Sequence, residues 1–149
     1  MGVFLGVVFL DQAAKYLASR LLTPRVSMEV VEPIFRLTLV RNPGGIFGIV
    51  WGGKLFYLFL SFLAIGLVAF YLVKAHLFIY RCSLALILGG ALGNLADRLR
   101  WGEVVDFLDF GLGRYRWPTF NLADSAITIG ILLLLFASFR REKGEEQDL

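Results

Sequence analysis

Four long apolar stretches, separated by polar connections, dominate this chain of 149 residues. A helix rises 1.5 Å per residue, so about 20 residues cross a bilayer core of about 30 Å. The stretches that are long enough are residues 1–22, 55–73, 82–99 and 120–139. A helix satisfies its own backbone hydrogen bonds, as a segment in hydrocarbon must. We therefore predict an α-helical membrane protein with four transmembrane helices, forming a single membrane-embedded domain, 1–149.

The first stretch is interrupted by Asp11, Gln12 and Lys15, whereas the second carries no charge. A cleaved secretory signal would begin with a basic segment and end at a small-residue cleavage site, and neither is clear here. We therefore expect the first stretch to be a helix of the folded protein, with Asp11 about 15 Å along it.

Two of the connections, 22–54 and 100–119, are long, and the one between them is short, which puts both long connections on the same side. In the first, IFRLTLVRN alternates apolar and polar residues, as a strand does, and NPGGIFG supplies turn residues. In the second, VVDFLDF favours a strand, and GLGRYRWP is an aromatic loop typical of a membrane interface. We predict a small extramembrane β-rich subdomain between helices 1 and 2.

Composition supports a membrane protein, because 58% of the residues are hydrophobic and only 18% are charged. The net charge of +3 is spread along the chain, so we expect no nucleic-acid partner. More Lys and Arg lie in the long connections than in the short loop and the tail. That count would put the long connections inside. We give it little weight, because several of those arginines adjoin polar motifs.

Polar residues inside a membrane are costly and are therefore candidates for function. In DQAAK, the four-residue spacing puts Asp11 and Lys15 on one helix face, where they form either a structural ion pair or part of a site. In GGALGNLADR, the glycines favour tight helix packing. Asn94 and Arg98 share a face there and are good donors for a peptide backbone.

A third cluster, FNLADS, puts Asn121 and Asp124 at the start of the last apolar stretch. A second acid, Asp106 of VVDF, lies on the same side of the membrane. Two carboxylates that meet cannot both ionise, so one keeps a proton and the other can act as a base, as an aspartic protease requires. Spacing alone does not exclude Asp109 or Glu103 as the second acid.

Other protease mechanisms lack their residues in this sequence. Neither G-x-S-x-G nor H-E-x-x-H occurs, and the single histidine, His76, lies in the short connection opposite the polar clusters. The single cysteine, Cys82, excludes an internal disulfide. Serine and zinc proteases are therefore disfavoured.

The five motifs DQAAK, RNPGGIFG, GGALGNLADR, VVDF and FNLADS, in this order among four apolar segments, resemble those of the lipoprotein signal peptidase family, the bacterial type II signal peptidases. The resemblance implies an aspartic endopeptidase of the bacterial cytoplasmic (inner) membrane, with cytoplasmic termini and an active site near the extracytoplasmic face. Such an enzyme removes the signal peptide from diacylglyceryl-modified prolipoproteins just before the lipidated cysteine. Its partners would be those lipidated substrates and membrane lipids, and it would work as a monomer without cofactor or metal.

Carried over by motif, the resemblance implies that Asp106 and Asp124 are the catalytic pair. The residues that would bind substrate or orient the site are Asp11, Lys15, Asn42, Asn94, Arg98 and Asn121. It also implies that the first long connection forms an extracytoplasmic β-cradle. The second glycine of RNPGG, Gly45, stands where the family often has alanine.

Two other functions remain open from the residues alone. A small proton-coupled transporter would use Asp11 or Asp124 and would leave Asp106 without a role. A bundle whose polar residues only pack the helices would tolerate Asp106→Asn.

Overall fold

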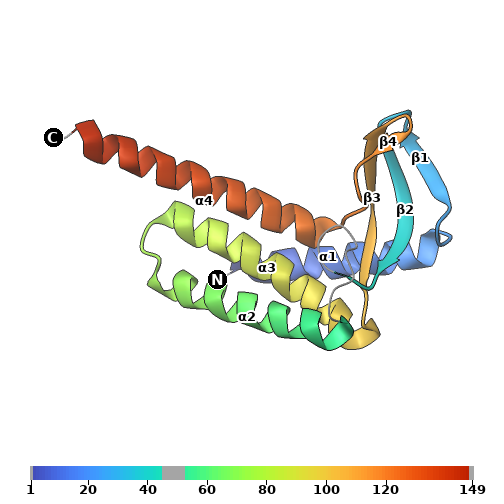
Figure 1. Ribbon diagram of the computed structural model, residues 1–149, viewed down its shortest axis with the longest axis horizontal. Helices are drawn as coiled ribbons and strands as arrows, with labels where there is room; N and C mark the ends of the chain where they lie inside the picture. Colours follow the sequence, from blue (N-terminus) through green and yellow to red (C-terminus); the bar gives the residue numbers. More distant parts are fainter. Residues whose placement is uncertain (1, 45–52, 148–149) are drawn as a thin grey trace.

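The structure is a computed structural model that describes residues 2–44 and 53–147, with side chains through residue 140. Its helices are α1 (Gly2–Leu21), α2 (Gly53–Lys74), α3 (Phe78–Trp101) and α4 (Leu122–Gln147) (Figure 1). Its strands are β1 (Ser27–Val31), β2 (Phe35–Asn42), β3 (Val104–Leu112) and β4 (Tyr115–Arg116). The long helices and the small sheet match the predicted class, whereas the predicted turn beyond residue 44 lies outside the described residues.

A helix overlaps each predicted apolar stretch, but three helix starts differ from the sequence pattern, and α4 continues to Gln147 rather than ending at residue 139. The second helix begins at Gly53 rather than residue 55. The third helix begins at Phe78 rather than residue 82, which shortens the preceding loop. The fourth begins at Leu122 rather than residue 120. Phe120 instead pairs with β3, since its carbonyl accepts the N–H groups of Phe107 at 3.0 Å and Leu108 at 2.8 Å. Backbone pairing with the sheet therefore prevents the helix from starting earlier.

Among the described residues, α2, α3 and Leu122–Arg140 of α4 are long and apolar enough to cross a membrane. Most large apolar side chains of α2 are exposed, as a lipid-facing surface requires. Helix α1 carries Asp11, Gln12 and Lys15, which lower its hydropathy. A fourth membrane-spanning helix stays a prediction.

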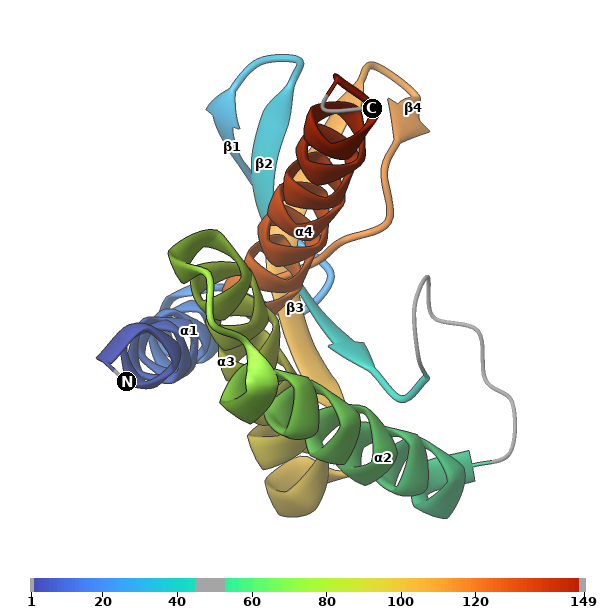
Figure 2. The ribbon, with the colours of Figure 1, turned by 90° about the vertical axis from the view of Figure 1, so that its left-hand side faces the viewer.

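Helix α3 is the centre of the bundle and packs against α1, α2 and α4 (Figure 2). Its glycines permit these close approaches. A Cβ at Gly89 would lie 2.7 Å from the Val7 Cβ of α1, and one at Gly90 would collide with the carbonyl of Ala123 in α4. The predicted role of these glycines in tight packing is confirmed.

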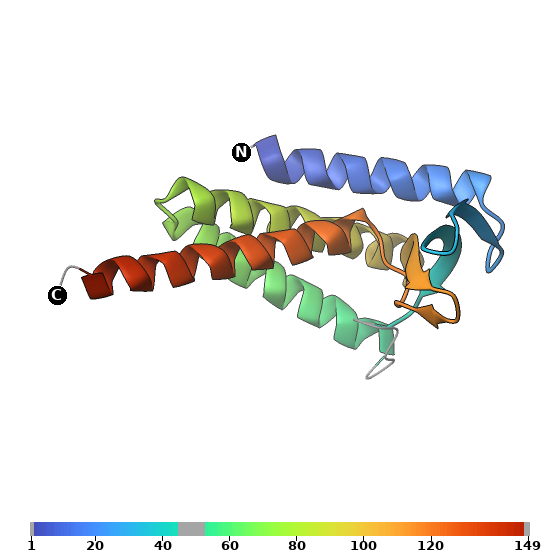
Figure 3. The same cartoon turned by 90° about the horizontal axis from the view of Figure 1, so that it is seen from above.

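The four strands form one antiparallel sheet in the order β1-β2-β3-β4. The sheet therefore takes strands from both long connections, not only from the one between the first two helices. It lies across one end of the helices, and its strands run across their axes (Figures 1 and 3). This arrangement brings β3 to the ends of α3 and α4.

Candidate active site

Asn121 and Asp124 cap the first turn of α4 reciprocally. The Asn121 Oδ1 accepts the main-chain N–H of Asp124 at 2.9 Å, and the Asp124 Oδ2 accepts the main-chain N–H of Asn121 at 3.3 Å. This is a capping box, in which two side chains satisfy N–H groups that have no partner within the helix. The helix dipole also favours a negative charge at this end. A carboxylate at the start of an apolar helix is therefore stabilised locally.

Asp106 lies on β3 and is 2% exposed. Its Oδ1 accepts the side-chain amide of Asn121 at 2.7 Å, and its Oδ2 accepts that of Asn42 at 3.1 Å. Burial, together with the negative charge of Asp124, raises the pKa of Asp106 to about 6, against the opposing effect of the two amide hydrogen bonds. Asp106 is thus a carboxyl group that keeps its proton at higher pH than an ordinary aspartate.

Asn94 of α3 connects the two acids. Its Nδ2 donates to the Asp124 Oδ1 at 2.8 Å, and its Oδ1 accepts the Asn121 amide at 3.2 Å. The same Asn121 amide donates to Asp106. A continuous chain of hydrogen bonds therefore runs from one carboxylate to the other, through residues of α3 and of the segment that begins α4.

Lys15 of α1 is the central cation beneath these acids. Its Nζ lies 2.9 Å from each of three oxygens, the Asp11 Oδ2, the Asp97 Oδ2 and the Asn94 Oδ1. The Asp11 and Lys15 pair predicted from the four-residue spacing is therefore present, and both side chains are buried. The ammonium group has three N–H donors, and all three have acceptors.

The two acids that flank Lys15 also hold the main chain beside Asp106 and Asp124, the candidate catalytic dyad. The Asp11 Oδ1 accepts the N–H of Ala123 at 2.9 Å, immediately before Asp124. The Asp97 Oδ2 accepts the N–H of Val105 at 3.1 Å, immediately before Asp106. One buried ion cluster thus fixes the backbone on both sides of the candidate dyad.

Arg98 follows Asp97 on α3, but its guanidinium contacts α2 and the segment after β2 rather than Lys15 and its partners. It donates to the Ser61 Oγ at 3.4 Å and to the carbonyl of Gly44 at 3.5 Å, and it lies within the electrostatic influence of Asp124 and Asp106. The Oδ1 of Asn42, at the end of β2, accepts the main-chain N–H of Gly44 at 3.0 Å, so Asn42 lies close to the residue that Arg98 contacts. The predicted polar donors of α3 and of the RNPGG motif therefore converge.

The alternative second acid, Asp109, faces away from Asp106 because side chains alternate along a strand. The Arg116 Nε donates to its Oδ1 at 2.9 Å, the Arg116 NH2 lies 2.8 Å from the same oxygen as an ion pair, and Thr38 donates to its Oδ2 at 2.8 Å. These partners occupy Asp109 on the face of β3 opposite to that of Asp106. Glu103 precedes β3 and is half-buried.

An open cavity of about 200 Å³ gives access to Asp106. It is lined by Val40, Arg41, Asn42, Pro43, Asp106, Pro118 and Thr119. In the part of the chain that the structure describes, His, Cys, Asp and Glu form no group of three suited to a metal ion. The site therefore offers two carboxylates, amide donors and an entrance.

Two members of the cluster, Asp97 and Gln12, were absent from the predicted site. Gln12 donates to the Asp97 Oδ1 at 2.9 Å and to the carbonyl of Gly93 at 3.1 Å. The only signal for Asp97 was its three-residue spacing from Asn94, which puts both on one helix face. Gln12 had no such signal, because its partners come from a helix more than 80 residues away in sequence.

Comparisons with known proteins agree on one family. Residues 3–140 match the family model described as signal peptidase (SPase) II. A lipoprotein signal peptidase of Burkholderia mallei (strain SAVP1) is 45% identical over 150 residues, covering 97% of this chain and 89% of the relative. Another, of Syntrophus aciditrophicus (strain SB), is 42% identical over 144 residues, covering 92% and 89%.

Two solved structures, both described as bacterial membrane enzymes studied by the in meso method, share the fold. One, at 2.3 Å resolution, has a TM-score of 0.88 and 31% identity, with coverage of 95% of this chain and 88% of the solved chain. The other, at 1.9 Å, has a TM-score of 0.82 and 33% identity, with coverage of 91% and 88%. Since the family model and the relatives span nearly the whole chain, this protein belongs to the signal peptidase II family and is a bacterial membrane peptidase.

Proposed function

We propose that this peptidase is an aspartic endopeptidase in which Asp106 and Asp124 activate water between them. The observation that carries the proposal is the chain of amide hydrogen bonds through Asn94 and Asn121 that joins the two carboxylates. Asp106 also lines an open cavity, so a substrate carbonyl can approach it.

The two carboxyl groups share one proton in the resting enzyme. Asp106 favours a proton because it is buried beside a second acid, which raises its pKa to about 6. The ionised member takes a proton from water as the water attacks the scissile carbonyl, and the protonated member donates to the carbonyl oxygen. The roles reverse when the amine leaves. The pair titrates as a unit, so these roles belong to the dyad rather than to one residue.

Amide and guanidinium donors hold the peptide backbone of the substrate. Asn42 lines the entrance, Arg98 donates to the carbonyl of Gly44 just beyond it, and Asn94 and Asn121 orient the acids. A peptide in a site with little water needs partners for its own N–H and C=O groups. Asp11 and Lys15 organise the site from α1 and do not touch the substrate.

The substrates are prolipoproteins whose cysteine carries a diacylglyceryl group, cut just before that cysteine. The relatives are named lipoprotein signal peptidases, which supports this choice. The acyl chains stay in the bilayer while the scissile bond lies at its surface, so the dyad belongs at a helix end. Asp124, in the first turn of α4, satisfies that requirement.

We further propose that α1 also spans the membrane, which makes four transmembrane helices in one domain that works as a monomer. The sheet then forms an extracytoplasmic cradle, and both termini are cytoplasmic. The sheet and the first turn of α4 lie at the same end of the bundle, which supports a dyad at the extracytoplasmic surface (Figure 3).

The test is cleavage of a diacylglyceryl-modified prolipoprotein by purified enzyme in detergent. The variants Asp106→Asn and Asp124→Asn are expected to fold, by thermal melt, and to lose cleavage. The matched variants Asp109→Asn and Glu103→Gln are expected to retain it. Cleavage by Asp106→Asn would show that another residue is the second acid. Wild-type enzyme that does not cut the lipidated substrate would overturn the substrate assignment. Proton-dependent ion flux through liposomes in the absence of cleavage would favour the transporter.

A further inference from the structure

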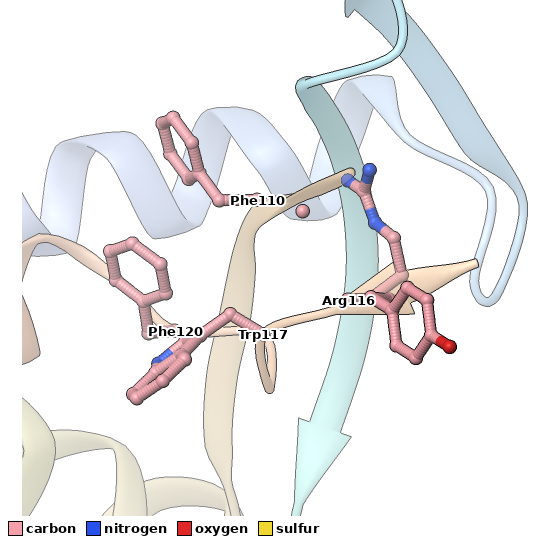
Figure 4. A pocket seen from close by; sticks show the side chains of 6 residues that line it. Phe110, Arg116, Trp117 and Phe120 are labelled. Atoms are coloured by element: carbon pink, nitrogen blue, oxygen red, sulfur yellow. The ribbon is translucent and has the colours of Figure 1, made fainter. Parts of the chain in front are cut away.

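A second open cavity, of about 530 Å³, lies on the sheet away from the acids. Its lining residues are Phe110, Gly111, Tyr115, Arg116, Trp117 and Phe120 (Figure 4). Figure 4 shows the rings of Phe110, Phe120 and Trp117 projecting to the same side of β3, away from the Arg116 guanidinium. The cavity is therefore aromatic on the side toward which the rings project.

The aromatic cavity lies on the same face of β3 as Asp106. Side chains alternate along a strand, so Asp106, Leu108 and Phe110 share one face, and four residues correspond to about 13 Å. The ring centroids of Phe110 and Phe35 are 4.5 Å apart, and those of Phe110 and Phe120 are 5.8 Å apart, both stacked. On this face of β3, the apolar residue Leu108 therefore lies between Asp106 and the rings of the cavity.

Arg116, the one charged side chain among the described residues that line the cavity, is already neutralised. It pairs with Asp109 on the opposite face, and its NH1 donates to the carbonyl of Pro33 at 2.9 Å. The rings that remain offer apolar contact but few hydrogen bonds. An extended peptide would leave its N–H donors and amide carbonyls unsatisfied there, whereas hydrocarbon has no polar group and an ester has no donor and only weak acceptors.

The cavity also lies beside the membrane-spanning part of the molecule. The far part of the sheet, with the β3–β4 hairpin, projects past the start of α4 (Figure 1). Phe120 lies two residues before α4, whose Ile129 and Leu132 are exposed apolar side chains. A lipid in the cavity could therefore continue along α4 into the bilayer.

We propose that this cavity binds the glyceryl-ester end of the diacylglyceryl group on the substrate cysteine. The inference rests on the proposed function, because that group is attached to the residue that immediately follows the scissile bond. The single bonds from the scissile carbonyl through the cysteine sulfur to the glyceryl esters span a distance comparable to that between Asp106 and Phe110. The carbonyl of Phe120 accepts N–H groups of Phe107 and Leu108, so a bound lipid contacts the segment that positions Asp106 and Asn121.

Photocross-linking tests the position of the lipid. A peptide with a diacylglyceryl cysteine, carrying a diazirine near one ester, is bound to the full-length Asp124→Asn variant in lipid nanodiscs. Mass spectrometry is expected to find the label on residues 110–120. Label confined to α2 or α3 would overturn the proposal. Equal labelling of residues 110–120 by a free phospholipid with the same diazirine would also overturn it, because the cavity would then hold bilayer lipid.

Kinetics tests whether the cavity contributes to recognition. Trp117→Ala and Phe110→Ala are expected to raise KM for the diacylglyceryl peptide about tenfold with little change in kcat, since an aromatic contact of this kind is lost. Trp117→Phe should restore most of the affinity. Leu112→Ala, at an exposed apolar position of the same hairpin outside the cavity lining, is the matched control and should leave KM unchanged.

The outcomes distinguish failure of the proposed function from failure of the lipid site alone. Wild-type enzyme that fails to cut the lipidated peptide contradicts the proposed function. Active wild-type enzyme with unchanged KM in both alanine variants contradicts only the lipid site. A fall in kcat and melting temperature at constant KM would assign the rings a structural role instead, and would equally overturn the inference.

Discussion

The side-chain amide of Asn121 donates to the Asp106 carboxylate at 2.7 Å, while the oxygen of the same side chain caps α4. The amide and the oxygen therefore have different tasks, one on the sheet and one on the helix. A substitution that keeps one group and removes the other can separate positioning of Asp106 from formation of the helix.

Asn121→Asp keeps the capping oxygen but replaces the amide donor with a third carboxylate beside Asp106 and Asp124. We expect cleavage to fall by about 100-fold or more, because the dyad loses a donor and gains a like charge. Cleavage assays with the lipidated substrate measure this. Thr128→Ala, which removes a hydroxyl bonded to the Asp124 carbonyl in the same helix, should keep near wild-type activity. Full activity of Asn121→Asp would show that the amide is dispensable.

The pH dependence of cleavage should respond to Asn42. Burial and the charge of Asp124 raise the pKa of Asp106 to about 6, so the shared proton is lost and cleavage declines as pH rises through that value. The Asn42 amide stabilises the charged form and lowers this pKa. Asn42→Ala should therefore move the alkaline limb of kcat/KM to higher pH.

The measurement is a profile of kcat/KM against pH for wild type and Asn42→Ala. Ser27→Ala is the control, because its hydroxyl bonds Thr38 on the same sheet but does not touch Asp106. A limb that stays in place or moves to lower pH in Asn42→Ala would contradict the role of this amide.

The sequence pattern predicted the helices and part of the sheet because both depend on local periodicity. It also predicted the Asp11 and Lys15 pair, since four-residue spacing fixes a shared helix face. Asp97 joins that pair only because α3 packs on α1, and spacing within one helix does not reveal this contact. Likewise, Asp106 and Asp109 point in opposite directions because side chains alternate along β3, and Arg116 binds Asp109. Spacing along the chain could not show which of these two acids faces the other site residues.

Removing the central cation should destabilise the fold. Lys15→Met leaves Asp11 and Asp97 buried without their shared partner, and breaking a buried ion pair in this way costs about 3–5 kcal/mol. We expect a lower melting temperature in detergent together with loss of cleavage. Lys74→Met, at the exposed end of α2, should leave both unchanged.

A double variant that removes one charge of each sign can show whether the loss of stability at residue 15 comes from an unbalanced charge or from altered packing. Lys15→Met combined with Asp97→Asn removes one positive and one negative charge, so it should recover part of the lost melting temperature. A double variant that is less stable than Lys15→Met alone would contradict the view that the uncompensated charge is responsible.

Gly93→Ala tests the distance between α3 and α1 at the ion cluster. A Cβ at Gly93 would lie 2.5 Å from the Asp11 Oδ2, closer than such contacts occur, so Asp11 must shift from the Ala123 N–H and from Lys15. We expect a loss of about 1–3 kcal/mol in stability from this overpacking and a larger loss of cleavage, because Ala123 adjoins Asp124.

Gly66→Ala is the matched control, since a Cβ in the middle of α2 meets no atom within 4 Å. Its melting temperature should stay the same or rise slightly, because alanine favours a helix more than glycine does. If Gly93→Ala melts and cleaves like Gly66→Ala, then Asp11 does not hold the start of α4 in the position that the dyad requires.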